Sequence, residues 1–185
     1  MISYLSGQLL HHTKDGAVIV VAGVGYEVIG LWLGRMALGS QISLYTYNYI
    51  ENESIPRLIG CQTKEARDLL IELISVNGVG PKMAGRILDA ASPQSIKSAI
   101  TTGDLDFLTH IKGLGKKTAQ KIILDLGKTL VEAVSSANSY IYDALSALSF
   151  DKREIDKVLE STDLTDLSES QALSIVLKKL GQKSG

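Results

Sequence analysis

The stretch that decides the fold of this chain is a short glycine motif that occurs twice. The first copy reads Gly78-Val79-Gly80-Pro81-Lys82-Met83-Ala84, and the second reads Gly113-Leu114-Gly115-Lys116-Lys117-Thr118-Ala119. Each copy follows an apolar run typical of a helix and opens a second helical pattern. Each therefore predicts two helices joined by a Gly-x-Gly turn, the helix-hairpin-helix arrangement.

Such a hairpin is suited to holding a phosphate group. Glycine adopts positive φ angles and has no Cβ to keep a sugar-phosphate chain at a distance. The helix that follows presents unpaired N–H groups and a partial positive charge to an anion. Pro81 fits the first turn of that helix, and Lys82, Lys116 and Lys117 add full charges at the same turns. Two such turns predict binding of a nucleic-acid backbone.

A Gly-x-Gly turn between helices has two other interpretations. A single copy is most often only a tight helix connection. The repeat argues against packing alone, because both copies share a lysine within two residues of the second glycine and an alanine four residues after it. A mononucleotide P-loop is disfavoured, since neither copy reads Gly-x-x-x-x-Gly-Lys-Ser/Thr or follows a β-type strand.

Charge is distributed unevenly along the 185 residues, whose net charge is −1. Residues 1–62 carry a net −1, residues 63–136 a net +2 and residues 137–185 a net −2. The positive excess lies with the hairpins, but it is small. Binding must therefore depend on backbone donors and a few lysines rather than on a broad basic face.

Composition also indicates the cellular compartment. The single cysteine, Cys61, excludes a disulfide framework and is typical of a reducing compartment. The sequence shows no signal peptide and no long apolar stretch that would span a membrane. We therefore expect a cytoplasmic chain that does not contact a membrane.

Residues 1–62 read as β structure. Asp15-Gly16 is a hairpin turn signal, and Gly23-Val24-Gly25 predicts a bulge or a barrel corner. Five short strands in this length fit a Greek-key barrel of the OB type, although composition alone leaves an SH3-like barrel open. The apolar runs that indicate strands are Leu5–Leu10, Ala17–Val21, Tyr26–Leu33 and Gln41–Tyr49.

Residues 63–134 predict an all-α domain that contains both hairpins. Thr63, Ser92 and Asp104 are candidate N-caps. The expected helices are Lys64–Ser75, Pro81–Ala91, Pro93–Thr101, Asp104–Ile111 and Lys116–Ser135.

The rest of the chain predicts a separate module. Residues 135–139 read as a short polar linker, and residues 140–185 as a small three-helix module with helices at Tyr140–Ser149, Lys152–Ser161 and Glu169–Lys179. So short a module leaves apolar groups exposed and is suited to holding a protein partner. The expected fold class is therefore α+β and multidomain.

No set of residues in the sequence predicts catalysis. His11, His12 and His110 have no carboxylate or thiol clustered with them at metal-ligand spacing. Asp125, ten residues beyond Gly115, reads as a solvated helix residue rather than the acid of a hairpin-type glycosylase. We expect a binding protein with no metal, no cofactor and no ATPase site.

Four motifs in register resemble those of one protein family. They are Met1-Ile2-x-x-Leu5-x-Gly7, Gly23-Val24-Gly25-Tyr26-Glu27-Val28, Asn77-Gly78-Val79-Gly80-Pro81-Lys82, and the second hairpin from Gly113 to Ala119. Over roughly residues 1–130 the chain resembles the RuvA family of bacterial Holliday junction branch-migration proteins.

The resemblance implies a homotetramer whose OB barrels hold a four-way junction in an open square, with an octamer on DNA left open. Each subunit's hairpins would bind minor-groove backbones, so recognition would follow DNA structure rather than sequence. The DNA-backbone contacts implied are Gly78, Gly80, Lys82, Gly113, Gly115, Lys116, Lys117 and Thr118.

The loop at residues 50–57 carries two carboxylates, Glu51 and Glu53. On its own it reads as a solvated hairpin tip, although acidic groups near DNA would repel phosphates. The family places an acidic pin at the centre of its tetramer. Glu53 aligns with the first pin carboxylate, and Ser54 stands where a second acid is usual. Whether Glu51 replaces that second charge is left open.

The family's C-terminal helices dock the AAA+ ATPase RuvB, which supplies the motor. The resemblance assigns this docking to Leu148, Phe150, Leu177 and Leu180. Docking of the RuvC resolvase is left open.

Two other function classes compete with the junction scaffold. One is a monomeric duplex- or RNA-binding module that uses the same hairpins. The other is a repair glycosylase or nuclease of the hairpin type.

Overall fold

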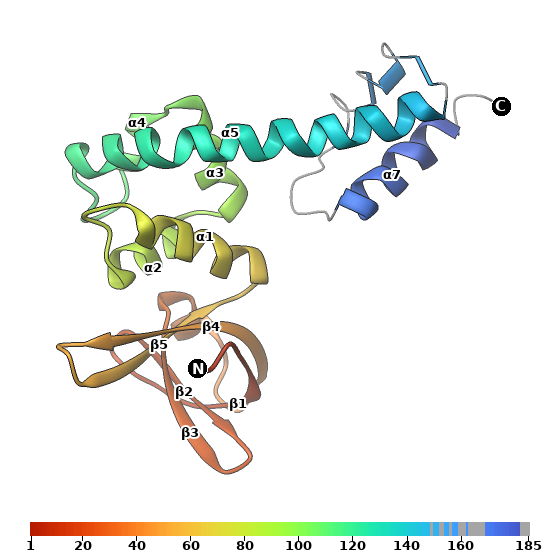
Figure 1. The fold of residues 1–185 in the computed structure, drawn as a ribbon. Helices are drawn as coiled ribbons and strands as arrows, with labels where there is room; N and C mark the ends of the chain where they lie inside the picture. Colours follow the sequence, from red (N-terminus) through yellow and green to blue (C-terminus); the bar gives the residue numbers. More distant parts are fainter. Residues whose placement is uncertain (149, 152–153, 156, 159–161, 163–168, 182–185) are drawn as a thin grey trace. The chain divides into compact units, whose positions relative to one another are not determined.

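The computed structural model describes residues 1–148, 150–151, 154–155, 157–158, 162 and 169–181 (Figure 1). The chain divides into two compact units, residues 1–127 and residues 128–185. The first unit holds the β structure and both helical hairpins.

The β structure is a closed five-stranded barrel. Its strands are β1 (Tyr4–His12), β2 (Gly16–Val21), β3 (Val24–Ile29), β4 (Gln41–Glu51) and β5 (Ile55–Cys61). Around the barrel they follow the order β1-β2-β3-β5-β4, with β1 also paired to β4. The β3–β5 pair is parallel and the others are antiparallel. The expected OB-type barrel is confirmed, and this strand order decides against the SH3-like alternative.

Apolar side chains that alternate along the strands fill the barrel, together with Leu33 from the segment that follows β3. They are Leu5, Leu9, Ala17, Ile19, Val28, Leu33, Ile42 and Leu44, all buried. The register of β1 against β2 shifts between Leu9 and His11. Such a bulge bends a strand, which lets β1 pair with neighbours on both sides.

The structure differs from expectation at both ends of β3. The glycine-containing segment before β3 is neither a bulge nor a corner but a two-residue hairpin turn, in which Ala22 and Gly23 have φ angles of 50° and 82°. The strand expected to reach Leu33 ends at Ile29, and Leu31–Arg35 forms a 3-10 helix, η1. The backbone N–H groups of Leu31 and Trp32 leave the sheet pattern because they donate to the Asp89 side chain, 58 and 57 residues away.

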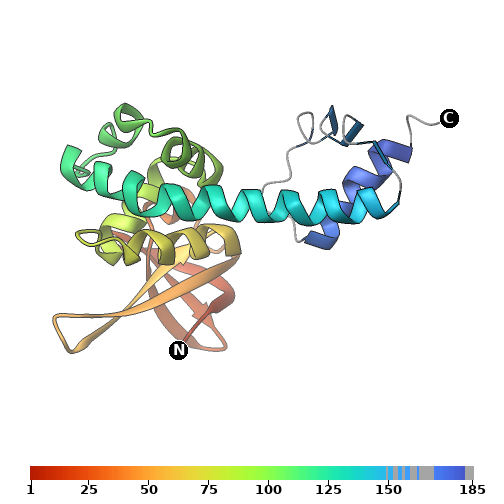
Figure 2. The ribbon, with the colours of Figure 1, turned by 45° about the horizontal axis from the view of Figure 1, so that its top comes forward.

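Four complete helices and the beginning of a fifth, α5, follow the barrel in the first unit (Figures 1 and 2). They are α1 (Lys64–Ser75), α2 (Pro81–Ala90), α3 (Pro93–Thr102) and α4 (Leu105–Thr109). The three expected N-caps are confirmed, since the side chains of Thr63, Ser92 and Asp104 each accept a backbone N–H bond. The first helix-hairpin-helix is α1–α2, and the second joins α4 to α5 (Lys116–Ala147).

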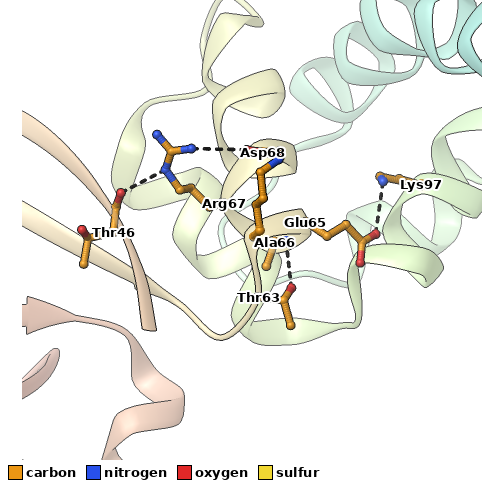
Figure 3. A network of polar contacts seen from close by, with 8 residues as sticks. Thr46, Thr63, Glu65, Ala66, Arg67, Asp68 and Lys97 are labelled. Atoms are coloured by element: carbon orange, nitrogen blue, oxygen red, sulfur yellow. Dashed lines mark hydrogen bonds and ion pairs between the residues drawn. The ribbon is translucent and has the colours of Figure 1, made fainter. Parts of the chain in front are cut away.

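Polar contacts of α1 attach these helices to the barrel and to each other (Figure 3). Arg67 Nε donates to the Thr46 carbonyl of β4 at 3.1 Å. Glu65 forms an ion pair with Lys97 of α3 at 3.1 Å. The first contact therefore holds α1 on the barrel, and the second holds α3 against α1.

The prediction of a linker at residues 135–139 is wrong. Helix α5 continues through this segment and ends at Ala147, so the separate helix expected from Tyr140 is part of α5. Serine and asparagine are weak helix formers but do not break a helix, and residues 128–147 contain neither proline nor glycine. The second unit begins within α5, at Lys128.

The second unit has a small apolar core of its own. It consists of Ile141, Leu145, Ile155, Val158, Ala172, Val176 and Leu180. Its last helix is α7 (Glu169–Gly181), close to the expected bounds. The helix expected at Lys152–Ser161 lies partly outside the described residues, although Glu154, Ile155, Lys157 and Val158 are helical.

Candidate nucleic-acid interface

The two hairpins have the same backbone hydrogen bonds at a fixed spacing of 35 residues. In the first, Val79 N donates to the Val76 carbonyl, and Ala84 N to the Gly80 carbonyl, both at 3.0 Å. In the second, Leu114 N donates to Ile111 and Ala119 N to Gly115, again at 3.0 Å. The apolar member of each Gly-x-Gly turn is buried. The sequence repeat is thus a structural repeat.

The glycines take the conformations that the turns require. Gly78 and Gly113, the first glycine of each turn, have φ angles of 97° and 90°, in the region that favours glycine. Gly80 is the N-cap of α2 and has no side chain, so it supplies no side-chain acceptor to the first turn of that helix. A Cβ at Gly78, Gly80 or Gly115 would meet nothing within 4 Å. These turns are therefore open to an anion from outside.

The predicted lysines lie at equivalent places in the two hairpins. Lys82 and Lys117 both follow the second glycine by two residues, and Lys116 precedes Lys117. All three are exposed, and the Thr118 side chain is half-buried. Only Lys82 has an ion-pair partner among the described residues, the carboxylate of Glu51.

Glu51 lies in an ion-pair chain that joins the barrel to the first hairpin. One carboxylate oxygen accepts from Lys82 Nζ, and the other from Arg57 Nε at 2.9 Å. Arg57 of β5 also lies 3.6 Å from Glu27 of β3. The hydrogen bond from Lys82, followed by that from Arg57, lowers the pKa of the Glu51 carboxyl. The same contact with Glu51 raises the pKa of Lys82.

The two predicted pin carboxylates have different surroundings. The loop between β4 and β5 consists of Asn52, Glu53 and Ser54, and Asn52 and Glu53 have positive φ angles of 50° and 62°. The Glu53 side chain is exposed at this tip, whereas the side chain of Glu51 at the base of the loop is only 17% exposed. Glu53 therefore has an exposed carboxylate at the tip of the loop, whereas the carboxylate of Glu51 is already paired with Lys82 and Arg57.

One further cation, which is not among the predicted contacts, lies near the hairpins. Arg86 of α2 is exposed and makes no ion pair within the described part of the chain. Its Nη1 lies 3.6 Å from the position that a Cβ on Gly113 would occupy. Arg86 thus reaches from the first helix-hairpin-helix to the second turn. Its spacing of four residues from Lys82, which puts both on one helix face, was the available signal.

Asp125 and Cys61 lie in different surroundings. Asp125 is exposed on α5. Cys61 is buried, and burial raises the pKa of its thiol to about 12. No group of three or more potential metal ligands occurs among the described residues. None of the described helices has the length and apolar character that a membrane crossing requires.

The four predicted docking residues of the second unit divide by exposure. Leu148 is 57% exposed, whereas Leu180 is only 4% exposed. Leu180 is buried because Ala172, Val176 and Leu180 recur every four residues and face the core of this unit. Its role in docking stays a prediction. Phe150 and Leu177 pack partly against the same core.

Comparisons with known proteins agree with this architecture. Residues 1–58 match the RuvA N terminal domain family, and residues 70–128 match the SAM-like Helix-hairpin-helix tandem family. Three curated relatives share the name Holliday junction branch migration complex subunit RuvA. The Porphyromonas gingivalis protein is 41% identical over 150 residues, covering 78% of this chain and 74% of its own. The Bdellovibrio bacteriovorus protein is 34% identical over 174 residues, covering 87% and 88%. The Acholeplasma laidlawii protein is 34% identical over 187 residues, covering 96% and 100%.

Proposed function

The chain belongs to the RuvA family, and from that premise we propose that it binds four-way junction DNA as the non-catalytic subunit of a branch-migration complex. The observation that carries the proposal is the duplicated hairpin. Two glycine turns with the same backbone bonds present helix N-termini and lysines to the outside. This arrangement suits the regular phosphate backbone of a duplex arm.

Lys116, Lys117 and Thr118 would contact the phosphates at the second hairpin, and Gly78, Gly80 and Lys82 at the first. Gly113 and Gly115, which have no Cβ, let the DNA backbone approach the second turn closely. Arg86 adds a cation between the two turns. Contacts of this kind position a duplex and carry no base sequence information. We therefore expect recognition of the junction's shape.

The barrel would assemble four chains around the junction. The family relationship supports this self-association. Leu10, Val24, Leu31 and Leu38 are among the exposed apolar side chains of residues 1–62 that are available for contacts between chains. The tetrameric state is what membership of the family implies. An octamer, with two tetramers on one junction, is the alternative assembly.

We assign the role of acidic pin to Glu53 alone. Its carboxylate is exposed at the tip of the β4–β5 loop, whereas Glu51 is engaged by Lys82 and Arg57. Glu53 would repel phosphates at the crossover and so direct strands into neighbouring arms. The variant E53Q should keep its affinity for junctions but change the speed of branch migration when the motor is present.

The second unit would dock the ATPase motor RuvB, with Leu148 as its exposed apolar anchor. The sequence contains no Gly-x-x-x-x-Gly-Lys-Ser/Thr motif, so ATP hydrolysis would come from that partner. The variant L148A should lose binding to RuvB and keep binding to DNA. The RuvC resolvase would be a further partner of the same assembly.

A competition experiment tests the proposal. Labelled four-way junction is bound to the full chain at fixed physiological salt and challenged with excess linear duplex of the same arm sequences. Retention of the junction supports the proposed function. Equal competition by the duplex would reduce the activity to generic backbone binding. Size-exclusion mass separates four chains from the monomeric alternative, and cleavage of the labelled DNA in the presence of metal would indicate a nuclease.

A further inference from the structure

The two equivalent lysines of the hairpins differ in one respect. Lys117 is exposed and makes no ion pair within the described residues, whereas Lys82 is bound by Glu51. The Lys82 side chain is nevertheless 57% exposed, and that of Glu51 is 17% exposed. The pair therefore lies at the surface of the hairpin, within reach of an incoming backbone.

The Glu51 carboxylate offers Lys82 the same chemistry as a DNA phosphate. Both are anions whose oxygens accept hydrogen bonds from an ammonium group. An ammonium group on a flexible four-carbon stem exchanges readily between such acceptors. DNA that reaches the first hairpin must therefore take Lys82 from Glu51, while at the second hairpin it meets Lys117, which has no ion-pair partner among the described residues.

From this contrast we propose that Glu51 is an internal competitor of DNA phosphate for Lys82, and that it weakens the first hairpin relative to the second. The inference rests on the proposed function, because it takes the hairpins as the DNA-binding site. Glu51 is then a residue that tunes affinity, not a member of the acidic pin.

The surroundings of Glu51 make the exchange feasible. Its second oxygen is held by Arg57 at 2.9 Å, so the carboxylate keeps a cationic partner after Lys82 leaves. Arg57 has a further carboxylate neighbour, Glu27, at 3.6 Å. The loss of Lys82 therefore leaves no unpaired carboxylate in the half-buried position, and the cost of the exchange stays low.

A double-mutant cycle measures the competition. The variants E51Q, K82Q and K117Q, with the combinations E51Q/K82Q and E51Q/K117Q, are made in the full chain. Affinity for a labelled linear duplex is measured by fluorescence anisotropy over a range of salt concentrations. Glutamine keeps the size of each side chain approximately and removes its charge. E51A serves as a second variant, and thermal unfolding establishes that every variant is folded.

We expect E51Q to bind duplex about two- to fivefold more tightly, the range that a partly exposed ion pair represents. Because Lys82 of the wild type is shared between Glu51 and the phosphate, the freed Lys82 of E51Q releases more counterion. The slope of log K against log salt should therefore steepen by a fraction of the ~0.9 expected for one full phosphate contact. K82Q should weaken binding more in the E51Q background than in the wild type. K117Q should weaken binding equally in both backgrounds, because no carboxylate in the described part of the chain pairs with Lys117.

An unchanged or lower affinity of E51Q would overturn the inference, and so would an equal effect of K82Q in both backgrounds. Either result would make Glu51 a residue that positions Lys82 rather than one that competes for it. The proposed function fails on a different observation, the wild-type chain's lack of preference for a junction over a duplex. Failure of the inference on Glu51 can therefore be distinguished from failure of the proposed function.

Discussion

Asp89 of α2 accepts a hydrogen bond from the backbone N–H of Leu31 at 3.0 Å and so joins the first helix-hairpin-helix to the barrel. The neighbouring N–H of Trp32 donates to the same carboxylate at 3.4 Å. The Trp32 indole N–H donates to the Gly60 carbonyl of β5 at 3.1 Å. One side chain thus caps η1 from another part of the chain and holds the hairpins in place on the barrel.

The substitution D89A should destabilise the chain. It removes the acceptor of two backbone N–H groups, and each net hydrogen bond contributes about 1 kcal/mol, so the free energy of unfolding should fall by about 1–2 kcal/mol. Urea unfolding followed by tryptophan fluorescence measures this, because Trp32 is the only tryptophan. D89N, which keeps one acceptor oxygen, should lose less. Equal stability of D89A and the wild type would show that water replaces the carboxylate without loss.

The same carboxylate predicts a pH dependence of stability. Burial raises the pKa of Asp89 above its usual 3.8, against the opposing hydrogen bonds from Leu31 and Trp32. At pH values between 3.8 and the raised pKa of the folded chain, the Asp89 carboxyl is protonated more often in the folded chain than in the unfolded chain. Its contribution to stability must therefore fall as the pH rises through that window and stay constant above it. Unfolding of the wild type and D89N across pH 3.5–7 tests this prediction, which a pH-independent difference between the two would contradict.

The sequence predicted what depends on local pattern. The hairpins were visible because a Gly-x-Gly turn, its buried apolar residue and its lysines all lie within seven residues. The N-caps Thr63, Ser92 and Asp104 act on residues three positions away. The alternation of apolar residues was enough to predict the barrel strands, since each strand carries this pattern in its own sequence.

Contacts between distant residues escaped prediction. The end of β3 depends on Asp89, 58 residues from Leu31, and the pairing of Glu51 with Lys82 joins β4 to α2. The continuity of α5 was missed because serine and asparagine disfavour a helix only weakly and do not break one. The burial of Leu180 follows from a core whose members come from separate segments.

The thiol of Cys61 should be inert in the folded chain. Burial raises its pKa to about 12, against a usual 9.0, so the thiolate fraction near pH 8 is lowered by about a thousandfold. Only 4% of the residue is exposed, which also limits access. Reaction with a thiol-specific reagent should be very slow in buffer and fast in urea. Rapid labelling under native conditions would mean that the end of β5 opens locally.

Two glycines of the first hairpin should separate folding from binding. Gly78 has a φ angle of 97°, so G78A should lower the free energy of unfolding by about 1–3 kcal/mol. Gly80 has φ −86° and ψ 169°, which alanine adopts freely, so G80A should stay within about 0.5 kcal/mol of the wild type. A Cβ at Gly80 would instead project into the open space beside the N-terminus of α2, where a phosphate would approach. G80A should therefore bind duplex DNA severalfold more weakly at unchanged stability, measured by anisotropy and urea unfolding. Unchanged binding of G80A would place the close approach of the backbone elsewhere than at this glycine.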